Sequence, residues 1–183
     1  TVLLKLHAGL TRPAIATLFP TAREPIVVLD SGANVDCSPQ ELVQFARLGA
    51  VYAEDVLGRH NPIVGLLSIG EEAEKGNAVV KEANQLLRSA GVNFQGNIEG
   101  RDILIDKADV MVCDGFTGNV ILKLAESLYE ISERQNLEHE YFDRFNFENY
   151  GGTPVLGVAK PVIIGHGISH AKAFKNMIIV AQK

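Results

Sequence analysis

Short apolar runs alternate with longer amphipathic stretches along most of this chain. Residues 26–30 (IVVLD) and 63–67 (IVGLL) are short apolar runs of the kind found in buried strands. Residues 92–95, 108–113 (ADVMVC) and 161–164 predict further strands. Because predicted helices separate these runs, the pattern indicates βαβ units. We expect an α/β fold with a mostly parallel sheet that helices cover on both faces.

Local signals predict where several helices begin and end. Ser38, Pro39 and Glu41 form the pattern of a capping box with Ser38 as N-cap, and they predict a helix to about residue 57. Residues 78–90 carry apolar side chains along one face and precede Gly91, which suits the left-handed position after a helix. Further helices are expected at residues 120–130 and 171–181, the second with an inward face of Phe174, Met177, Ile178 and Ala181.

Residues 131–149 depart from this pattern, because they are polar and aromatic without a strand period or a strong helix period. We expect either a protruding arm here or two pieces joined across residues that this sequence does not contain. The chain also begins at Thr1, without an initiator Met, in a stretch that has the pattern of a helix. We therefore expect a single α/β domain over residues 1–183 that lacks its N-terminal part.

Composition and charge exclude several classes of protein. The chain has 183 residues, 46% of them hydrophobic and 21% charged, as in ordinary soluble globular domains. Its net charge of −5 and the absence of a Lys/Arg run argue against a nucleic-acid partner. No apolar run approaches the roughly 18 residues of a membrane span, and no signal peptide is visible. The two cysteines have no metal-type spacing and form no disulfide framework, so we expect a cytoplasmic protein without a bound metal.

The loops after the predicted strands are rich in Gly, Asn and small polar residues. In an open parallel sheet, ligands bind at the carboxyl ends of the strands. Glycine lets backbone N–H groups approach an anion closely, and asparagine adds uncharged donors. Lys75 and Arg101 supply local cations to a chain that is acidic overall. The combination predicts a phosphate or oxyanion site. The loops concerned are residues 30–34, 68–77, 96–101, 114–119 and 165–169.

Each of these loops also has a purely structural interpretation, because Gly and Asn are common turn residues. The segment 114–119 (DGFTGN) favours function, although Thr117 or Asn119 could also cap the next helix. Cys37 and Cys113 are more typical of core or loop residues than of nucleophiles, because neither has a histidine close in sequence. The motifs of nicotinamide enzymes, P-loop enzymes, serine hydrolases and HExxH metalloproteases are absent.

Several stretches resemble one known family, the phosphate acyltransferases of bacterial phospholipid synthesis, often called the PlsX family. Residues 30–36 resemble its DxGANVD loop, and residues 65–77 resemble GLLNxGxExxKGN with Ser68 at the position of the Asn. Residues 93–102 resemble NFxGNxEGRD, and residues 108–123 resemble the most characteristic segment of the family. The remaining matches are at residues 12–14, 150–152 and 165–167.

The resemblance implies a fold like that of isopropylmalate and isocitrate dehydrogenases, shared with phosphotransacetylases, and a homodimer. It implies a cytoplasmic enzyme, without a cofactor, that associates peripherally with the membrane surface through a helical protrusion. The expected reaction converts long-chain acyl-acyl-carrier-protein and inorganic phosphate to acyl phosphate. This chain departs from the family in three ways: it lacks the N-terminal portion, it has a shortened protrusion at residues 131–149, and it carries Ile168 and His170 in the last loop.

Site residues follow from the loops and from the reaction that the resemblance implies. The proposed catalytic residues are Lys75, Asn77, Asp114, Asn119 and His166. The proposed phosphate- and substrate-binding residues are Asp30, Gly32, Asn34, Gly70, Asn97, Arg101, Gly115, Thr117 and Gly118. The alternatives are a coenzyme A-dependent phosphotransacetylase and a non-catalytic, membrane-associated scaffold. A β-decarboxylating dehydrogenase would need a metal-binding carboxylate cluster and a nicotinamide site, neither of which we find in the sequence.

Overall fold

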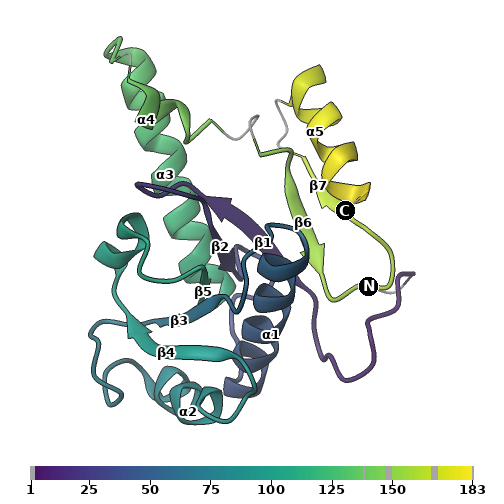
Figure 1. Ribbon diagram of the computed structural model, residues 1–183, viewed down its shortest axis with the longest axis vertical. Coiled ribbons are helices and arrows are strands. Elements are labelled where there is room, and N and C mark those ends of the chain that lie inside the picture. The colour runs from purple at the N-terminus through teal and green to yellow at the C-terminus, as the bar shows by residue number, and fades with distance from the viewer. Residues whose placement is uncertain (1–2, 138, 147–149, 166–168, 183) are drawn as a thin grey trace.

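A computed structural model describes residues 3–137, 139–146, 150–165 and 169–182. Its centre is a seven-stranded sheet with the strand order β4-β3-β5-β2-β1-β6-β7 (Figure 1). The strands are β1 (Ala14–Phe19), β2 (Ile26–Leu29), β3 (Ile63–Leu67), β4 (Asn93–Ile98), β5 (Val110–Val112), β6 (Thr153–Leu156) and β7 (Ile163–Ile164). The helices are α1 (Pro39–Asp55), α2 (Ala78–Leu87), η1 (Gly100–Ile105), α3 (Gly115–Arg134), α4 (Glu140–Asp143) and α5 (Ala171–Gln182).

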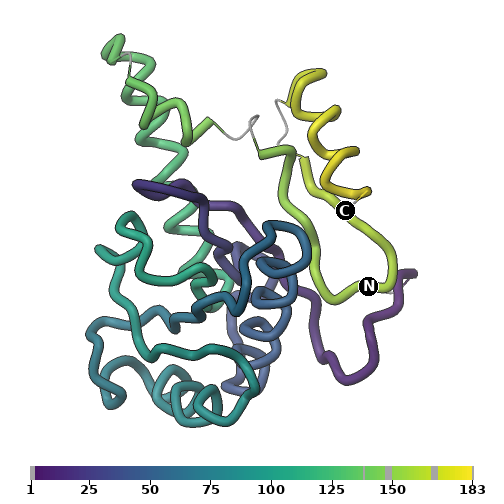
Figure 2. The backbone as a smooth tube through the Cα atoms, viewed as in Figure 1, coloured from purple at the N-terminus to yellow at the C-terminus, as the bar shows by residue number. Residues whose placement is uncertain are grey.

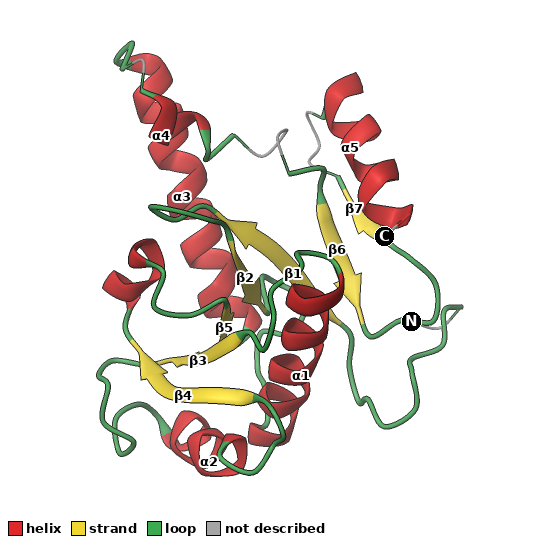
Figure 3. Ribbon diagram, viewed as in Figure 1, coloured by secondary structure: helices red, strands yellow, loops and turns green. Residues whose placement is uncertain are grey.

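The central strands are buried on both faces, which explains why they read as continuous apolar runs. In β5, Val110 and Val112 pack in the core beneath α1 and α2, and Met111 between them packs on the opposite face with Ala125 of α3. Successive side chains of a strand point to opposite faces, so one short run serves both cores. The α/β prediction is therefore confirmed, with helices on both faces of the sheet (Figure 3).

The sheet divides into a parallel half and an antiparallel half. β4, β3, β5 and β2 pair in parallel, whereas β1 pairs antiparallel with β2, β6 with β1, and β7 with β6. Neither β1 nor β6 was predicted from the sequence, so the antiparallel half was not predicted either. The N-terminal stretch is also not helical: it runs beside the segment after β6, where Leu6 bridges Val158 (Figure 2).

The helix at residues 39–55 begins where it was predicted. Ser38 accepts a hydrogen bond from the backbone N–H of Glu41, and the Glu41 side chain accepts one from the backbone N–H of Ser38. The capping box is therefore complete. By contrast, α2 ends at Leu87, three residues earlier than predicted, with Arg88 as its C-cap. Gly91 does have a left-handed φ of +75°, but it lies in the turn that follows the helix.

Residues after Glu130 continue α3 to Arg134 and then form the short helix α4. These elements extend away from the sheet (Figure 1). The chain then returns to the core through Phe145, whose ring meets that of Phe19 edge-on at 6.0 Å. The aromatic residues of this segment thus fasten it to the sheet.

The predicted inward face of the last helix is wrong for most of its members. Met177 is buried, but Phe174 is 58% exposed, Ile178 is 61% exposed and Ala181 is also exposed. The physical reason is that α5 lies against the short edge strand β7 (Figure 1), which is too small to cover a full apolar face.

Candidate anion site at the carboxyl ends of the parallel strands

A cavity of about 840 Å³ lies where β2, β3 and β5 end. Its apolar wall comes from strand ends and from α1 and α2, and its polar wall comes from the loops that follow the strands. Of the predicted site residues, Asn77, Asp114 and Thr117 line this cavity. The other lining residues are Val35, Asp36, Cys37, Leu42, Leu66, Leu67, Ser68, Ile69, Gly76, Val79, Val80, Gly100 and Cys113.

Three helices begin at this cavity. α1, α2 and α3 follow β2, β3 and β5, and their N-caps are Ser38, Asn77 and Asp114. A helix N-terminus carries a partial positive charge and unpaired backbone N–H groups. The convergence of three such ends makes the cavity suited to an anion.

Asp30 directly follows β2 and is fully buried. One carboxylate oxygen accepts hydrogen bonds from the backbone N–H groups of Ile15 (3.0 Å) and Ala33 (3.1 Å). The other accepts from the backbone N–H (2.7 Å) and the side-chain amide (2.8 Å) of Asn34. Because a carboxylate has about four lone-pair sites, its accepting capacity is taken up by the protein itself. The structure thus places Asp30 as a support of the loop.

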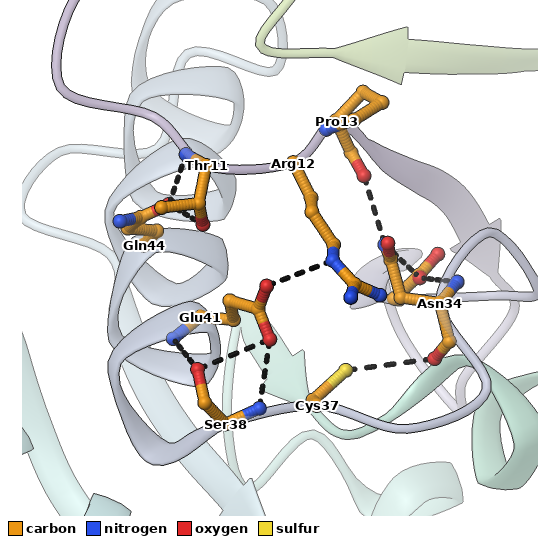
Figure 4. A network of polar contacts seen from close by, with 9 residues as sticks. Thr11, Arg12, Pro13, Asn34, Cys37, Ser38, Glu41 and Gln44 are labelled. Atoms are coloured by element: carbon orange, nitrogen blue, oxygen red, sulfur yellow. Dashed lines mark hydrogen bonds and ion pairs between the residues drawn. The ribbon is translucent and has the colours of Figure 1, made fainter.

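Asn34 also connects the loop to the N-terminal segment. Its side-chain amide donates to the carbonyl of Pro13 at 2.8 Å (Figure 4). Beside this contact, the Arg12 guanidinium pairs with Glu41 of the capping box at 2.9 Å (Figure 4). The β2–α1 loop is therefore bonded to the segment just before β1, which in turn is paired with α1. Asn34 does not line the cavity.

The glycines of residues 114–119 permit a close approach of α3 to this loop. A Cβ on Gly115 would stand 2.7 Å from the carbonyl oxygen of Asn34, to which the Gly115 N–H donates at 2.7 Å. A Cβ on Gly118 would stand 1.9 Å from the carbonyl oxygen of Asp30. Gly32 adopts a φ of +130°, which favours glycine, and faces Asn119. The structure gives these glycines a packing role.

Asp114 caps α3, and neither Thr117 nor Asn119 does. Its carboxylate accepts from the backbone N–H of Thr117 at 2.8 Å and from the Thr117 hydroxyl at 2.9 Å. The Asn119 amide donates instead to the carbonyl of Ser31 at 3.5 Å, across to the β2–α1 loop. Thr117 and Asn119 were predicted as possible caps because the helix was expected to begin at residue 120, and this prediction is wrong.

The β3–α2 loop carries three predicted site residues, Gly70, Lys75 and Asn77, and of these three Asn77 alone lines the cavity. Asn77 caps α2 by accepting from the backbone N–H of Val80 at 2.9 Å. Lys75 precedes it by two residues, is exposed, and has no ion pair within the described part of the chain. Gly70 lies against the Lys75 side chain, since a Cβ there would meet its Cγ at 2.9 Å.

Asn97 and Arg101 lie outside the cavity wall. Asn97 is buried, accepts from the Asn84 amide at 2.8 Å and donates to the carbonyl of Glu72 at 2.8 Å. Arg101 is 75% exposed in its side chain and pairs with Glu99 at 2.6 Å. His166, the last predicted residue, lies outside the described residues.

Two cysteines and one serine line the cavity without having been predicted as site residues. Burial raises the pKa of Cys37 to about 12, and burial also raises the pKa of Cys113. Both therefore remain protonated thiols near neutral pH and are poor nucleophiles. Ser68 stands at the end of β3 with a buried hydroxyl that has no hydrogen-bond partner among the described residues. The only sequence signal for it was its place in a strand-end loop.

Known proteins resemble this chain in sequence and in fold. A sequence profile described as "Fatty acid synthesis protein" matches residues 1–183. The chain belongs to this family. It is 48% identical over 190 residues to a phosphate acyltransferase of Aquifex aeolicus, a match that covers 93% of this chain and 56% of that protein. It is 45% identical over 194 residues to a phosphate acyltransferase of Desulforamulus reducens, covering 96% of this chain and 58% of that one. The chain thus spans little more than half the length of these relatives.

Solved structures support the fold of this family member. A phosphotransacetylase from Streptococcus pyogenes superposes with a TM-score of 0.65 at 20% identity and covers 98% of this chain and 56% of its own. A branched-chain phosphotransacylase from Enterococcus faecalis gives 0.60 at 16% identity, covering 92% of this chain and 63% of its own. At these identities the likeness is one of fold, and the predicted relation to phosphotransacetylases is confirmed at that level.

The described residues also bear on metal binding and on membrane insertion. They contain no group of three or more His, Cys, Asp or Glu side chains placed to hold a metal ion. Within the same ranges, no helix combines the length and apolarity that crossing a bilayer requires.

Proposed function

We propose that the protein containing this chain is an acyltransferase that converts long-chain acyl-acyl-carrier-protein and inorganic phosphate to acyl phosphate for phospholipid synthesis. The observation that carries the proposal is the cavity at which α1, α2 and α3 all begin. Positive helix ends favour an anion such as phosphate, and the apolar wall favours a reaction centre shielded from water. Membership in the fatty acid synthesis protein family supports the same reading.

This reaction does not require strong general acid–base catalysis. A phosphate oxygen attacks the thioester carbonyl, the tetrahedral intermediate collapses, and the carrier leaves as a thiolate. Phosphate is already anionic near neutral pH, so the site must mainly position two anionic partners and stabilise the oxyanion. Lys75 would supply the cation, and Asn77, Thr117 and Asn119 would donate hydrogen bonds. Asp114 and His166 would orient groups or carry protons.

The proposed partners also include a second copy of the chain. Apolar side chains of α3 form an exposed row at four- and three-residue spacing, from Phe116 (63% exposed) through Leu124 (64%) to Ile131 (53%), with Val120 and Leu128 between them. We propose that this row contributes to a homodimer. The family resemblance further supports a cytoplasmic protein that meets the membrane surface peripherally.

Residues 131–149 are proposed to be a shortened form of a protruding arm. The match to the Aquifex relative extends over 190 residues, yet it covers 93% of this 183-residue chain. That relative therefore has additional residues inside the matched region, in keeping with a longer arm.

The test uses the intact protein, long-chain acyl-acyl-carrier-protein and inorganic phosphate, with acyl phosphate trapped as hydroxamate by hydroxylamine. Hydroxamate that depends on phosphate, with little product from acetyl-coenzyme A, is the expected result. Product from the coenzyme A thioester alone would favour the phosphotransacetylase. An inactive, folded protein that still dimerises and binds vesicles would favour the scaffold.

A further inference from the structure

The cavity at the carboxyl ends of β2, β3 and β5 is larger than an inorganic anion requires. Its volume of about 840 Å³ is in the range of pockets that enclose a small organic molecule. Inorganic phosphate, a single atom with its oxygens, would fill only a fraction of that space. Much of the wall that remains is apolar and comes from β3, α1 and α2, at Leu66, Leu67, Leu42, Val79 and Val80. The cavity therefore suits a ligand that has an apolar part beside its anion.

Two strand-end loops each bring one large apolar side chain to this cavity. Val35 is the only large apolar residue of residues 30–36 (DSGANVD), and Ile69 is the only one of residues 68–77 (SIGEEAEKGN). Both line the cavity, yet Val35 is 61% exposed and Ile69 is 82% exposed. Single exposed apolar residues are common on protein surfaces. These two, however, stand in otherwise polar loops and border one cavity, which indicates contact with an apolar ligand.

This apolar rim and the polar helix ends belong to the same cavity. β5 lies between β3 and β2 in the sheet, and Asp114 and Thr117, which follow β5, line the cavity together with the two loops. In the proposed reaction the thioester carbonyl must touch the phosphate, so the acyl chain has to extend away from the anion. A thioester whose carbonyl lies beside the helix ends can place its chain against the rim. Contact with the chain would remove the rim side chains from water, and burying one methylene group strengthens binding about fourfold.

We propose that Val35 and Ile69 contact the acyl chain of the thioester substrate and set a preference for long chains. The inference rests on the proposed function, because it takes a long-chain acyl thioester as the ligand of this cavity. It adds two specificity-determining residues to the site. Neither of them takes part in the chemical step.

The test compares Ile69→Ser with Ile105→Ser in the intact protein. Ile105 is 64% exposed on η1 and does not line this cavity. Both side chains are exposed, so neither variant should lower the melting temperature appreciably. With saturating phosphate, Ile69→Ser is expected to lower kcat/KM for hexadecanoyl-acyl-carrier-protein about tenfold, the scale of one to two buried methylene groups. The same variant should change kcat/KM for acetyl-acyl-carrier-protein less than about twofold.

Val35→Ser should reduce the preference for the long chain in the same direction, and Ile105→Ser should leave kcat/KM for both thioesters unchanged. A ratio of hexadecanoyl to acetyl activity that stays the same in Ile69→Ser or in Val35→Ser overturns the contact assigned to that residue. An equal loss of activity toward both thioesters overturns it as well, because the residue would then act on the carrier or on packing instead of the chain.

A binding measurement separates this inference from the proposed reaction. No acyl phosphate can form in buffer without phosphate, so titration calorimetry there gives the dissociation constants of the two thioesters. The unmodified protein and Ile105→Ser should bind the hexadecanoyl form more tightly than the acetyl form, and this preference should be about tenfold smaller in Ile69→Ser. If the unmodified protein makes no acyl phosphate but shows this pattern, the reaction is wrong and the acyl contact stands. No preference in the unmodified protein, or an equal preference in all three proteins, overturns the contact.

Discussion

Gly118, in the first turn of α3, lies so close to the backbone of Asp30 that a Cβ at residue 118 would stand 1.9 Å from the Asp30 carbonyl oxygen. The same Cβ would stand 3.1 Å from the sulfur of Cys113. The first turn of α3 is thus in direct contact with the backbone that follows β2. The position of the α3 N-terminus at the cavity depends on this contact.

Gly118→Ala should therefore destabilise the protein. The added methyl group cannot be relieved by a side-chain rotation because it meets backbone, so α3 must shift, at a cost of about 1–3 kcal/mol or more in the free energy of unfolding. Urea denaturation followed by circular dichroism measures this cost. Gly100→Ala is the matched control, because a Cβ at Gly100 meets nothing within 4 Å. Equal stability of the two variants would show that α3 is not packed against the loop in this way.

The raised thiol pKa values predict a loss of stability at alkaline pH. Below pH 9, the ordinary pKa of a free thiol, cysteine is protonated in both the folded and the unfolded chain. Above pH 9 the unfolded chain releases a proton that the folded chain keeps, since the pKa of Cys37 is raised to about 12. The free energy of unfolding should fall by about 1 kcal/mol per thiol between pH 9 and pH 10.

Cys37→Ser removes the contribution of one thiol to this decrease in the free energy of unfolding. Its free energy of unfolding, measured in urea at pH 7.5 and pH 10, should decrease less than that of the unmodified protein. Other groups titrate in both proteins, so they cancel in the comparison. Identical decreases would contradict the protonated state assigned to Cys37.

Lys75 carries the cationic part of the proposed site, and Lys75→Met should lower turnover of acyl-acyl-carrier-protein about tenfold or more. The reason is that one charge facing an anionic reaction centre contributes on the scale of a charge-assisted hydrogen bond. Lys81→Met, which removes an exposed lysine farther along α2, is the control and should retain full activity. Asn119→Ala tests the donor role in the same assay. Turnover within about twofold of the unmodified protein in both Lys75→Met and Asn119→Ala would refute the assignment.

Leu124→Glu should weaken the proposed homodimer, because it places a charge in the middle of the exposed apolar row of α3. Sedimentation velocity across a dilution series measures the change as a shift toward the monomer. Ile105→Glu is the control: Ile105 is 64% exposed, as Leu124 is, but it lies on η1. A dimer that dissociates equally in both variants, or in neither, would remove α3 from the proposed interface.

The fold was predictable where its determinants are local. The capping box of α1 needs only Ser38 and Glu41, three residues apart, and the structure contains it. β6 was missed because its pairing with β1 joins residues as distant as Leu156 and Ala14. The exposed face of α5 was misassigned for a similar reason. Periodicity shows that a helix has an apolar face, but not whether another element covers it.

The candidate site shows the same division. Glycine and asparagine at strand ends predicted where the cavity lies, but not which donors face it. Asn34 bonds to the carbonyl of Pro13, and Asn97 is bonded to Asn84, so these amides are used within the protein. These hydrogen-bond partners of Asn34 and Asn97 lie 21 and 13 residues away along the chain, so a local sequence pattern cannot predict them. Ser68 was passed over because a hydroxyl becomes informative only once its lack of a partner is known.

The saturated carboxylate of Asp30 has a consequence for redesign. Four donors from Ile15, Ala33 and Asn34 occupy it, so replacing it alters the loop rather than the ligand. A mutagenesis library aimed at a different acyl donor should therefore hold Asp30 and Asn34 constant. The positions to vary are on the apolar side of the cavity, at Ile69, Val79 and Val80. Selection would then act on the shape of the pocket while the floor on which α3 rests stays intact.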